Sequence, residues 1–271
     1  MSGILSTGTS ALLAFQRALG TVGHNVANAA TPGYSRQRVD MAARPGQATG
    51  NGYVGQGVDI ARLQRLADGL VFARQVDSSG ELGRLSQMAS LSGRVDALVS
   101  DPATGLSTQW SSFFNAAKGV TADPASPIAR GALLASADQL ATRWRSLDKQ
   151  LSTLDAETSQ RLQGKVGDAN VLAKEIASLN QAIVAAGANA APDLIDARAL
   201  RVDQLALLVG AETVAQDDGA LNVFTAGGQA LVLGNRAMTI TTAADPFNPE
   251  RLQVAIEGTG GKVRLPAASI S

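Results

Sequence analysis

The sequence predicts a mainly α-helical fold with a small β region in its last quarter. Three patterns carry this prediction: an apolar repeat of alternating four- and three-residue spacing over the first 26 residues, a longer repeat of the same kind from residue 133 to 183, and a change to a period of two after residue 210. We therefore expect an N-terminal coiled-coil helix, a long α-helical rod or bundle, and then short antiparallel β-strands.

The composition excludes several classes of function. Basic and acidic residues balance at 23 each, so no basic field attracts nucleic acid or an anionic membrane. Cysteine is absent, which rules out disulfides, thiolate catalysis and cysteine-bound metals. No apolar run approaches the roughly 18 residues of a membrane-spanning helix, and the first residues do not form a secretory signal. We expect no membrane insertion, and an export route, if one is used, that keeps the N-terminus.

The first predicted helix runs from about Ile4 to Ala29, and Thr31-Pro32-Gly33 ends it. Arg17 is the only formally charged side chain before Arg36. Its a/d seam consists of Met1, Leu5, Gly8, Leu12, Phe15, Leu19, Val22 and Val26. Because a helix so poor in charge must bury one face, we favour intermolecular or end-to-end pairing along this seam over simple core packing.

An extended, glycine-rich linker is expected over residues 35–67, as a loop or loose hairpin. A second helix follows from about residue 68 to 99, with Met88, Leu91, Val95 and Leu98 in its seam and Asp101-Pro102 at its end. A shorter helix over residues 106–120 is expected to supply most of the aromatic core, through Trp110, Phe113 and Phe114.

Ser126-Pro127 predicts the start of a very long helix, with a capping hydroxyl followed by proline at the first helical position. No proline interrupts the sequence until Pro192, so about 60 residues would form a rod of about 90 Å. Its leucines and Trp144 form a stripe that we interpret as core. A further helix is expected from Pro192 to Leu208, capped by Gly210.

Short strands are predicted at residues 221–224, 230–233, 238–241 and 252–256, separated by Asp-Gly, Gly-Gly and Gly-Asn turns. The expected organisation has four parts. They are a coiled-coil segment (1–34), the linker (35–67), a long-helix bundle (68–210) and an incomplete antiparallel β region (211–271).

Candidate chemical groups are few, and we predict no catalytic, cofactor or metal site. His24 is the only histidine and lacks an acidic neighbour in sequence, so a structural or interfacial role is favoured. An acidic and basic cluster on the fifth helix consists of Asp193, Asp196, Arg198, Arg201 and Asp203. Its alternating signs favour solvated or interhelical ion pairs, with a hydrolase as the remote alternative.

Asn25 and Asn28 suit a helix end, where their side chains bond the local backbone. They predict a capping network that fixes the turn into Tyr34, and they could also contact a neighbouring subunit.

The stretch from Asn25 to Tyr34 resembles the N-terminal signature of the axial proteins of the bacterial flagellum, which comprise rod, hook and hook-associated proteins. Its continuation, Ser35-Arg36-Gln37, is similar to the hook-associated proteins of the hook–filament junction. Three further stretches resemble those proteins in the same order: Gly55–Val58 with Arg65–Asp68, Glu175–Asn180, and Asp193–Arg198 followed by Asp218-Gly219 and Gly227–Val232.

The resemblance implies a structural protein without catalysis, exported unfolded by the flagellar type III system without a cleaved signal peptide and located outside the cell. It implies self-assembly into a ring, with the hook protein, a second junction protein (hook-associated protein 3) and an export chaperone as partners. In that family the N-terminal helix pairs with a C-terminal helix. The expected assembly interface is Leu5, Leu12, Phe15, Leu19, Val22, Asn25, Val26, Asn28, Thr31, Pro32, Gly33 and Tyr34.

Two expectations qualify this interpretation. A distal rod or hook subunit of the same family is the alternative, disfavoured by Ser35-Arg36-Gln37 and by the long helix. Family members are about twice this length, so we expect this sequence to be a fragment or a truncated form that lacks the pairing helix.

Overall fold

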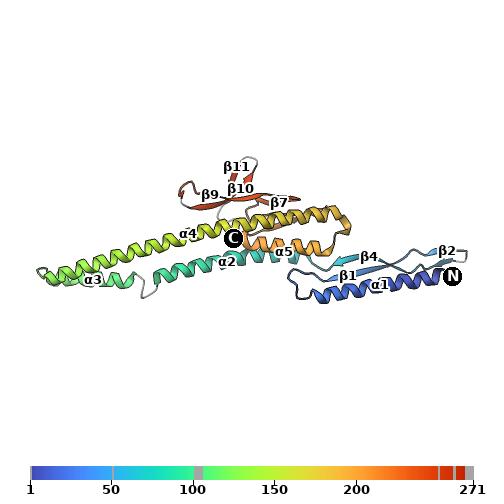
Figure 1. Ribbon diagram of the computed structural model, residues 1–271, viewed down its shortest axis with the longest axis horizontal. Coiled ribbons are helices and arrows are strands. Elements are labelled where there is room, and N and C mark those ends of the chain that lie inside the picture. The colour runs from blue at the N-terminus through green and yellow to red at the C-terminus, as the bar shows by residue number, and fades with distance from the viewer. Residues whose placement is uncertain (1, 51, 101–105, 250, 259–260, 266–271) are drawn as a thin grey trace.

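The computed structural model describes the chain except residues 1, 51, 101–105, 250, 259–260 and 266–271. The molecule is a long rod with a β region on one side and a separate N-terminal extension at one end (Figure 1). The α-helices of the described residues are α1 (Ser2–Ala27), α2 (Gly69–Ser100), α3 (Ser107–Ala122), α4 (Pro127–Ala186) and α5 (Pro192–Val209). The predicted helices are therefore confirmed, although Met1 and the Asp101-Pro102 stop lie outside the described residues.

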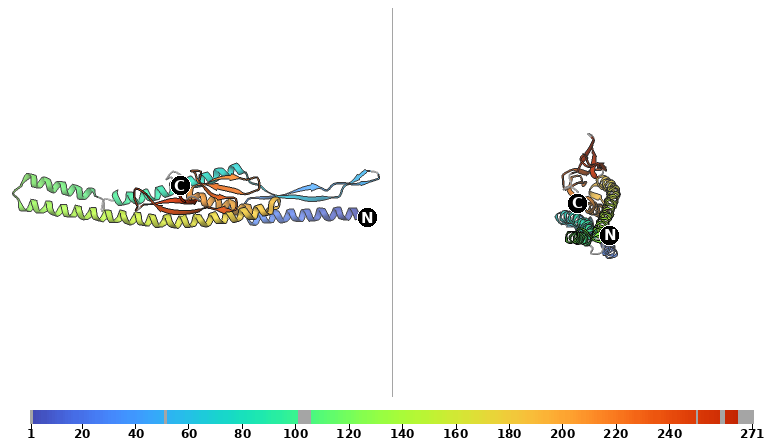
Figure 2. Two further views of the ribbon diagram at one scale, coloured as in Figure 1. Left: turned by 90° about the horizontal axis from the view of Figure 1, so that it is seen from above. Right: turned by 90° about the vertical axis from the view of Figure 1, so that its left-hand side faces the viewer.

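Helix α4 is one continuous helix of 60 residues, as its start signal predicts. The Ser126 side chain accepts a hydrogen bond from the Ala129 amide at 3.3 Å, and Pro127 occupies the first turn. Helix α3 packs against α4, and α5 packs against both α4 and α2. Helices α2 and α3 thus follow one another along the rod, and α4 returns beside them (Figures 1 and 2).

The main core lies where the last part of α4 meets α5 and the β region. Ile176, Val202 and Leu205 from the helices are fully buried against Val223 and Leu231 from the strands. The described strands of this β region are antiparallel and form two sheets, in the orders β5-β6-β7-β8 and β11-β10-β9. Their bounds are β5 (Glu212–Ala215), β6 (Leu221–Phe224), β7 (Ala230–Leu233), β8 (Arg236–Ala237), β9 (Thr239–Ala244), β10 (Leu252–Gly258) and β11 (Gly261–Arg264). The four predicted strands correspond to β6, β7, β9 and β10, whereas β5, β8 and β11 were not predicted.

The expected aromatic core is wrong. No residue of α3 is buried, and Trp110 and Phe114 are 40% and 55% exposed. On α4, Leu140, Leu147 and Leu154 are buried as predicted. Two further members of the stripe, Trp144 and Leu151, stay exposed, as do Met88 and Val95 of the α2 seam. The aromatic residues of α3 stay exposed because α3 packs chiefly against α4 among the described elements, which leaves its outer face uncovered.

The glycine-rich linker is a long β-hairpin built in two parts, which makes it more regular than the expected loose hairpin. Its strands are β1 (Gln37–Ala43), β2 (Gln47–Thr49), β3 (Gly52–Val54) and β4 (Val58–Arg65). Strand β1 pairs with β4, with a bulge between Asp40 and Met41, and β2 pairs with β3. The hairpin runs beside α1 past the end of the rod (Figures 1 and 2). We call residues 2–66, which hold α1 and this hairpin, the N-terminal unit.

Candidate assembly interface

One face of α1 is fixed to the hairpin. Ala14 and Ser10 are buried there, and the Ser10 hydroxyl accepts a hydrogen bond from the Val58 amide at 3.3 Å. Gly57 has a φ of +90°, and a Cβ at that position would collide with Ser10 Oγ. This glycine therefore supplies both the backbone conformation and the close approach that seat the helix.

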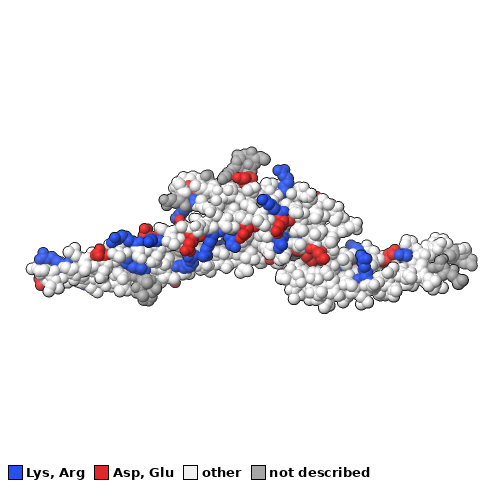
Figure 3. All heavy atoms as spheres, viewed as in Figure 1, with Lys and Arg blue, Asp and Glu red and all other residues white. Residues whose placement is uncertain are grey.

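The opposite face of α1 carries large apolar side chains that no described residue covers. Leu5, Leu12, Leu19 and Val26 are each at least 70% exposed, and Phe15 and Val22 are 62% and 57% exposed. The lower edge of the molecule where α1 lies is free of charged side chains in Figure 3. A contiguous apolar face of this kind marks an interaction surface. We call it the exposed seam, and its role in assembly stays a prediction.

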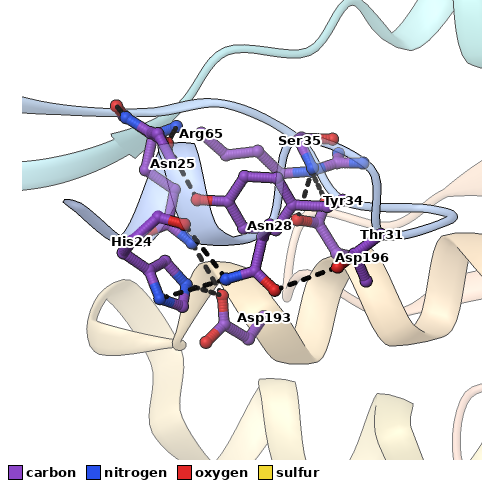
Figure 4. Close-up of polar contacts among 10 residues, drawn as sticks. His24, Asn25, Asn28, Thr31, Tyr34, Ser35, Arg65, Asp193 and Asp196 are labelled. Atoms are coloured by element: carbon purple, nitrogen blue, oxygen red, sulfur yellow. Dashed lines mark hydrogen bonds and ion pairs between the residues drawn. The ribbon is translucent and has the colours of Figure 1, made fainter. Parts of the chain in front are cut away.

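Asn25 forms the centre of the turn that follows α1 (Figure 4). Its Oδ1 accepts hydrogen bonds from the Tyr34 hydroxyl and from the Gln37 amide, both at 2.8 Å. Its Nδ2 donates to the Gln37 carbonyl at 2.9 Å. One amide side chain thus ties the end of the helix to the first strand, which confirms the predicted capping network.

Asn28 completes the same network. Its Nδ2 donates to the His24 carbonyl at 3.0 Å, and its Oδ1 accepts from the Thr31 hydroxyl at 3.2 Å. His24 packs edge-on against the Tyr34 ring, with 5.4 Å between ring centroids. These bonds give the signature residues a structural role, and a contact with another subunit remains an additional prediction.

The turn rests on the first turns of α5, where two carboxylates receive its donors (Figure 4). Asp196 accepts from the Ser35 amide at 2.8 Å and from Arg65 Nε at 2.5 Å. Asp193 accepts from Gln37 Nε2 at 2.7 Å and lies 3.5 Å from His24 Nε2. Burial raises the pKa of Tyr34, and the charges of Asp193 and Asp196 raise it further, so its hydroxyl stays protonated and able to donate.

The rest of the α5 cluster forms the expected ion pairs and hydrogen bonds. Arg201 pairs with Glu175 of α4 at 2.5 Å, and Asp203 accepts from Ser79 of α2 at 2.7 Å. Arg198 is buried and donates to Asn180 Oδ1 at 2.8 Å. Burial lowers the pKa of Arg198, and the charge of Arg65 lowers it further.

Among the described residues, no three His, Cys, Asp or Glu side chains are grouped as metal ligands.

The small cavity beside the turn, about 220 Å³, is lined by residues of the stretch from His24 to Tyr34 and by residues of α5. None of the described helices is long and apolar enough to cross a membrane.

The sequence analysis did not predict the hydrogen-bond partners of Gln37, Arg65 and Ser10. Gln37 and Arg65 bond to α5 across separations of 156 and 131 residues, and no local periodicity reports a contact of that kind. Ser10 gives a weak signal, because a serine in an apolar helical stretch can bond locally or to a neighbour.

A rod of paired helices with an uncovered apolar helix at one end is typical of elongated structural proteins. Residues 92–270 match the model of the flagellar hook-associated protein FlgK helical domain, and residues 5–34 match that of the flagella basal body rod protein. The chain belongs to the family of FlgK flagellar hook-associated proteins.

Individual relatives agree with this assignment. Flagellar hook-associated protein 1 of Escherichia coli (strain K12) is 32% identical over 275 residues, which cover 98% of this chain and 50% of the relative. The protein of the same name from Bacillus subtilis (strain 168) is 27% identical, covering 93% of this chain and 52% of the relative. The chain thus spans about half the length of the curated relatives it matches.

A solved structure is also similar. The flagellar hook junction protein FlgK from Burkholderia pseudomallei superposes with a TM-score of 0.66 and 28% sequence identity, covering 73% of this chain and 37% of that one.

Proposed function

We propose that this protein is a structural subunit of the bacterial flagellum at the junction between hook and filament, and that its exposed seam is an axial packing surface. The observation that carries the proposal is the exposed apolar face of α1. This face points to solvent because the opposite face of the helix is fixed to the hairpin. Family membership supports the location, since the relatives are named as hook-associated and hook junction proteins.

In this proposal the seam pairs with a second apolar helix to form a coiled coil, and subunits assemble into a ring. The hook protein and a second junction protein are the neighbours along the axis, and a chaperone accompanies the subunit before export. The type III system exports it to the outside of the cell with its N-terminus retained. No catalysis is part of the proposal, because the carboxylates of the α5 cluster are engaged in structural bonds.

The test introduces charge into the seam of the complete protein. Leu12→Glu and Leu19→Glu each place a carboxylate where a paired helix would bury it, at a cost of several kcal/mol, on the order of 2–5. We expect both variants to be exported but to fail to incorporate at the hook tip. Gln16→Glu is the matched control, because Gln16 is an exposed residue of the same helix outside the seam.

Secretion is measured by the amount of subunit in the medium, and incorporation by electron microscopy of hooks and filaments. Normal filaments in both seam variants would show that the seam is not an assembly surface.

The match of residues 5–34 to the rod-protein model keeps a distal rod or hook subunit as the second candidate. A deletion strain separates the two. An intact hook without a filament supports the junction role, whereas loss of the hook itself supports the alternative.

A further inference from the structure

The N-terminal unit meets the rod over a small contact, at the first turns of α5. On one side lie the turn after α1 and the ends of β1 and β4, and on the other lie Asp193, Asp196 and Leu200. The chain crosses between the two bodies only at Leu66–Asp68, where Asp68 then caps α2 through the Leu70 amide at 2.8 Å. We call this contact the joint.

Directional polar bonds dominate the joint. The two carboxylates lie three residues apart on one face of α5 and receive groups from three separate segments of the N-terminal unit. These groups are the His24 ring, the Ser35 amide, the Gln37 side chain and the Arg65 guanidinium. Three hydrogen bonds, with the 3.5 Å contact between His24 and Asp193, converge from three segments and define an orientation, which a single bond cannot do.

Apolar contact at the joint is close but narrow. Gly33 approaches Leu200 so tightly that an added Cβ would lie 3.0 Å from Leu200 Cβ. The large side chains of α1 point elsewhere and stay exposed. Two bodies joined by a small polar contact are expected to move relative to one another unless specific bonds hold them.

We propose that Asp193 and Asp196 are positioning residues that fix the orientation of the N-terminal unit, and hence of the exposed seam, relative to the rod. Asp196 is suited to this role because it is only 5% exposed and uses both of its oxygens, one for the Ser35 amide and one for Arg65. Losing Arg65 leaves a buried carboxylate without its charged partner, which favours opening of the joint to water.

The orientation can be measured without any assembly assay. The chain contains no cysteine, so Gln16→Cys in α1 and Ser178→Cys in α4 introduce two exposed labelling sites, one in each body. Spin labels at these sites report the distance distribution between the N-terminal unit and the rod in the full chain. We expect a narrow distribution for the otherwise unaltered chain.

Asp193→Asn with Asp196→Asn, and separately Arg65→Gln, should broaden that distribution about twofold, as expected when the bonds across a small inter-body contact are removed. The midpoint of thermal unfolding of the rod, followed by circular dichroism, should stay unchanged. Asp203→Asn is the matched control on the same helix, because Asp203 bonds Ser79 and Gln75 of α2, within the rod. It should leave the distribution narrow.

An unchanged, narrow distribution in Arg65→Gln and in the double carboxylate variant would overturn the proposal. If the double variant fails to fold, Arg65→Gln still tests the proposal, because it removes the bond to Asp196 from β4 and leaves α5 unaltered. The orientation itself does not depend on the proposed junction role, although its consequence for assembly rests on that role. A broadened distance distribution together with normal filaments would support the positioning role of the two carboxylates and contradict the need for a fixed seam in assembly. Failure of this inference and failure of the proposed function are therefore distinguishable.

Discussion

The N-terminal unit and the core of the rod place their apolar residues in opposite ways. In the core, Ile176 and Leu205 are fully buried between α4, α5 and the sheets, whereas Leu12 and Leu19 of α1 are 70% and 72% exposed. The rod is therefore held together by apolar burial, and the N-terminal unit is held to it by hydrogen bonds and ion pairs. This difference separates residues that stabilise the chain from residues that remain available to another surface.

The sharpest test of that comparison truncates one side chain in each region. Ile176→Ala should lower the free energy of unfolding by about 2–5 kcal/mol, because it leaves a cavity in a closed core. Leu19→Ala should change it by less than about 0.5 kcal/mol, because its side chain already faces solvent in the isolated chain. Urea unfolding of the two variants gives both numbers. A comparable loss in Leu19→Ala would mean that the seam is packed within the isolated chain, and the comparison would fail.

A second test concerns how closely the rod helices approach. A Cβ on Gly83 of α2 would collide with the Leu207 carbonyl oxygen of α5, which is backbone and cannot rotate away. Gly83→Ala should therefore destabilise the rod by about 3 kcal/mol, the upper end of overpacking costs. Gly93→Ala, in the same helix with open space around it, should stabilise by about 0.5–1 kcal/mol. Equal effects at the two glycines would show that α2 and α5 can separate without cost.

The joint offers a third, smaller test with a closely matched pair. Gly33 and Gly228 share a φ of +79°, so alanine suffers the same backbone strain at each, about 1–2 kcal/mol. Only at Gly33 does an added Cβ meet a neighbour, Leu200. Gly33→Ala should consequently cost about 1 kcal/mol more than Gly228→Ala in chemical unfolding. It should also broaden the label distribution across the joint, whereas Gly228→Ala should not. A larger cost for Gly228→Ala would contradict a close contact at the joint.

Local signals explain which elements were predictable. Ser126-Pro127 and Gly210 mark helix ends through capping and left-handed geometry, and both act within a few residues of sequence. The turn network was predictable for the same reason, because Asn25 and Asn28 bond to backbone and side chains within 12 residues.

Burial along α4 was predictable only in part. The repeat on α4 aligns Leu140, Trp144 and Leu147 in one stripe, but it does not say what lies against the stripe at each level of the rod. Leu140 and Leu147 are covered and Trp144 is not. The contact between the turn and α5 could not be predicted for a related reason. The sequence around a carboxylate on a helix does not indicate a partner more than 100 residues away.

The smallest expected effect concerns acid and the hairpin of the N-terminal unit. The pKa of Asp40 is lowered chiefly by the hydrogen bond from Arg62 and further by Arg38, and the pKa of Asp59 is lowered by Arg44. A carboxyl group with a lowered folded-state pKa contributes stability that is present above its unfolded value of about 3.9 and is lost as the pH falls through the folded value. The hairpin should thus keep its stability down to about pH 4 and lose it below that point. Because the Asp59 side chain is exposed and Asp40 pairs with two exposed arginines, the effect should be small and should shrink in high salt. Circular dichroism melts of the chain and of Asp40→Asn test this expectation, since the variant should show a weaker dependence of the melting temperature on pH below about 4. An undiminished dependence in Asp40→Asn would mean that Asp40 does not stabilise the hairpin. The ion pairs would then be a consequence of strand pairing and not a cause of its stability.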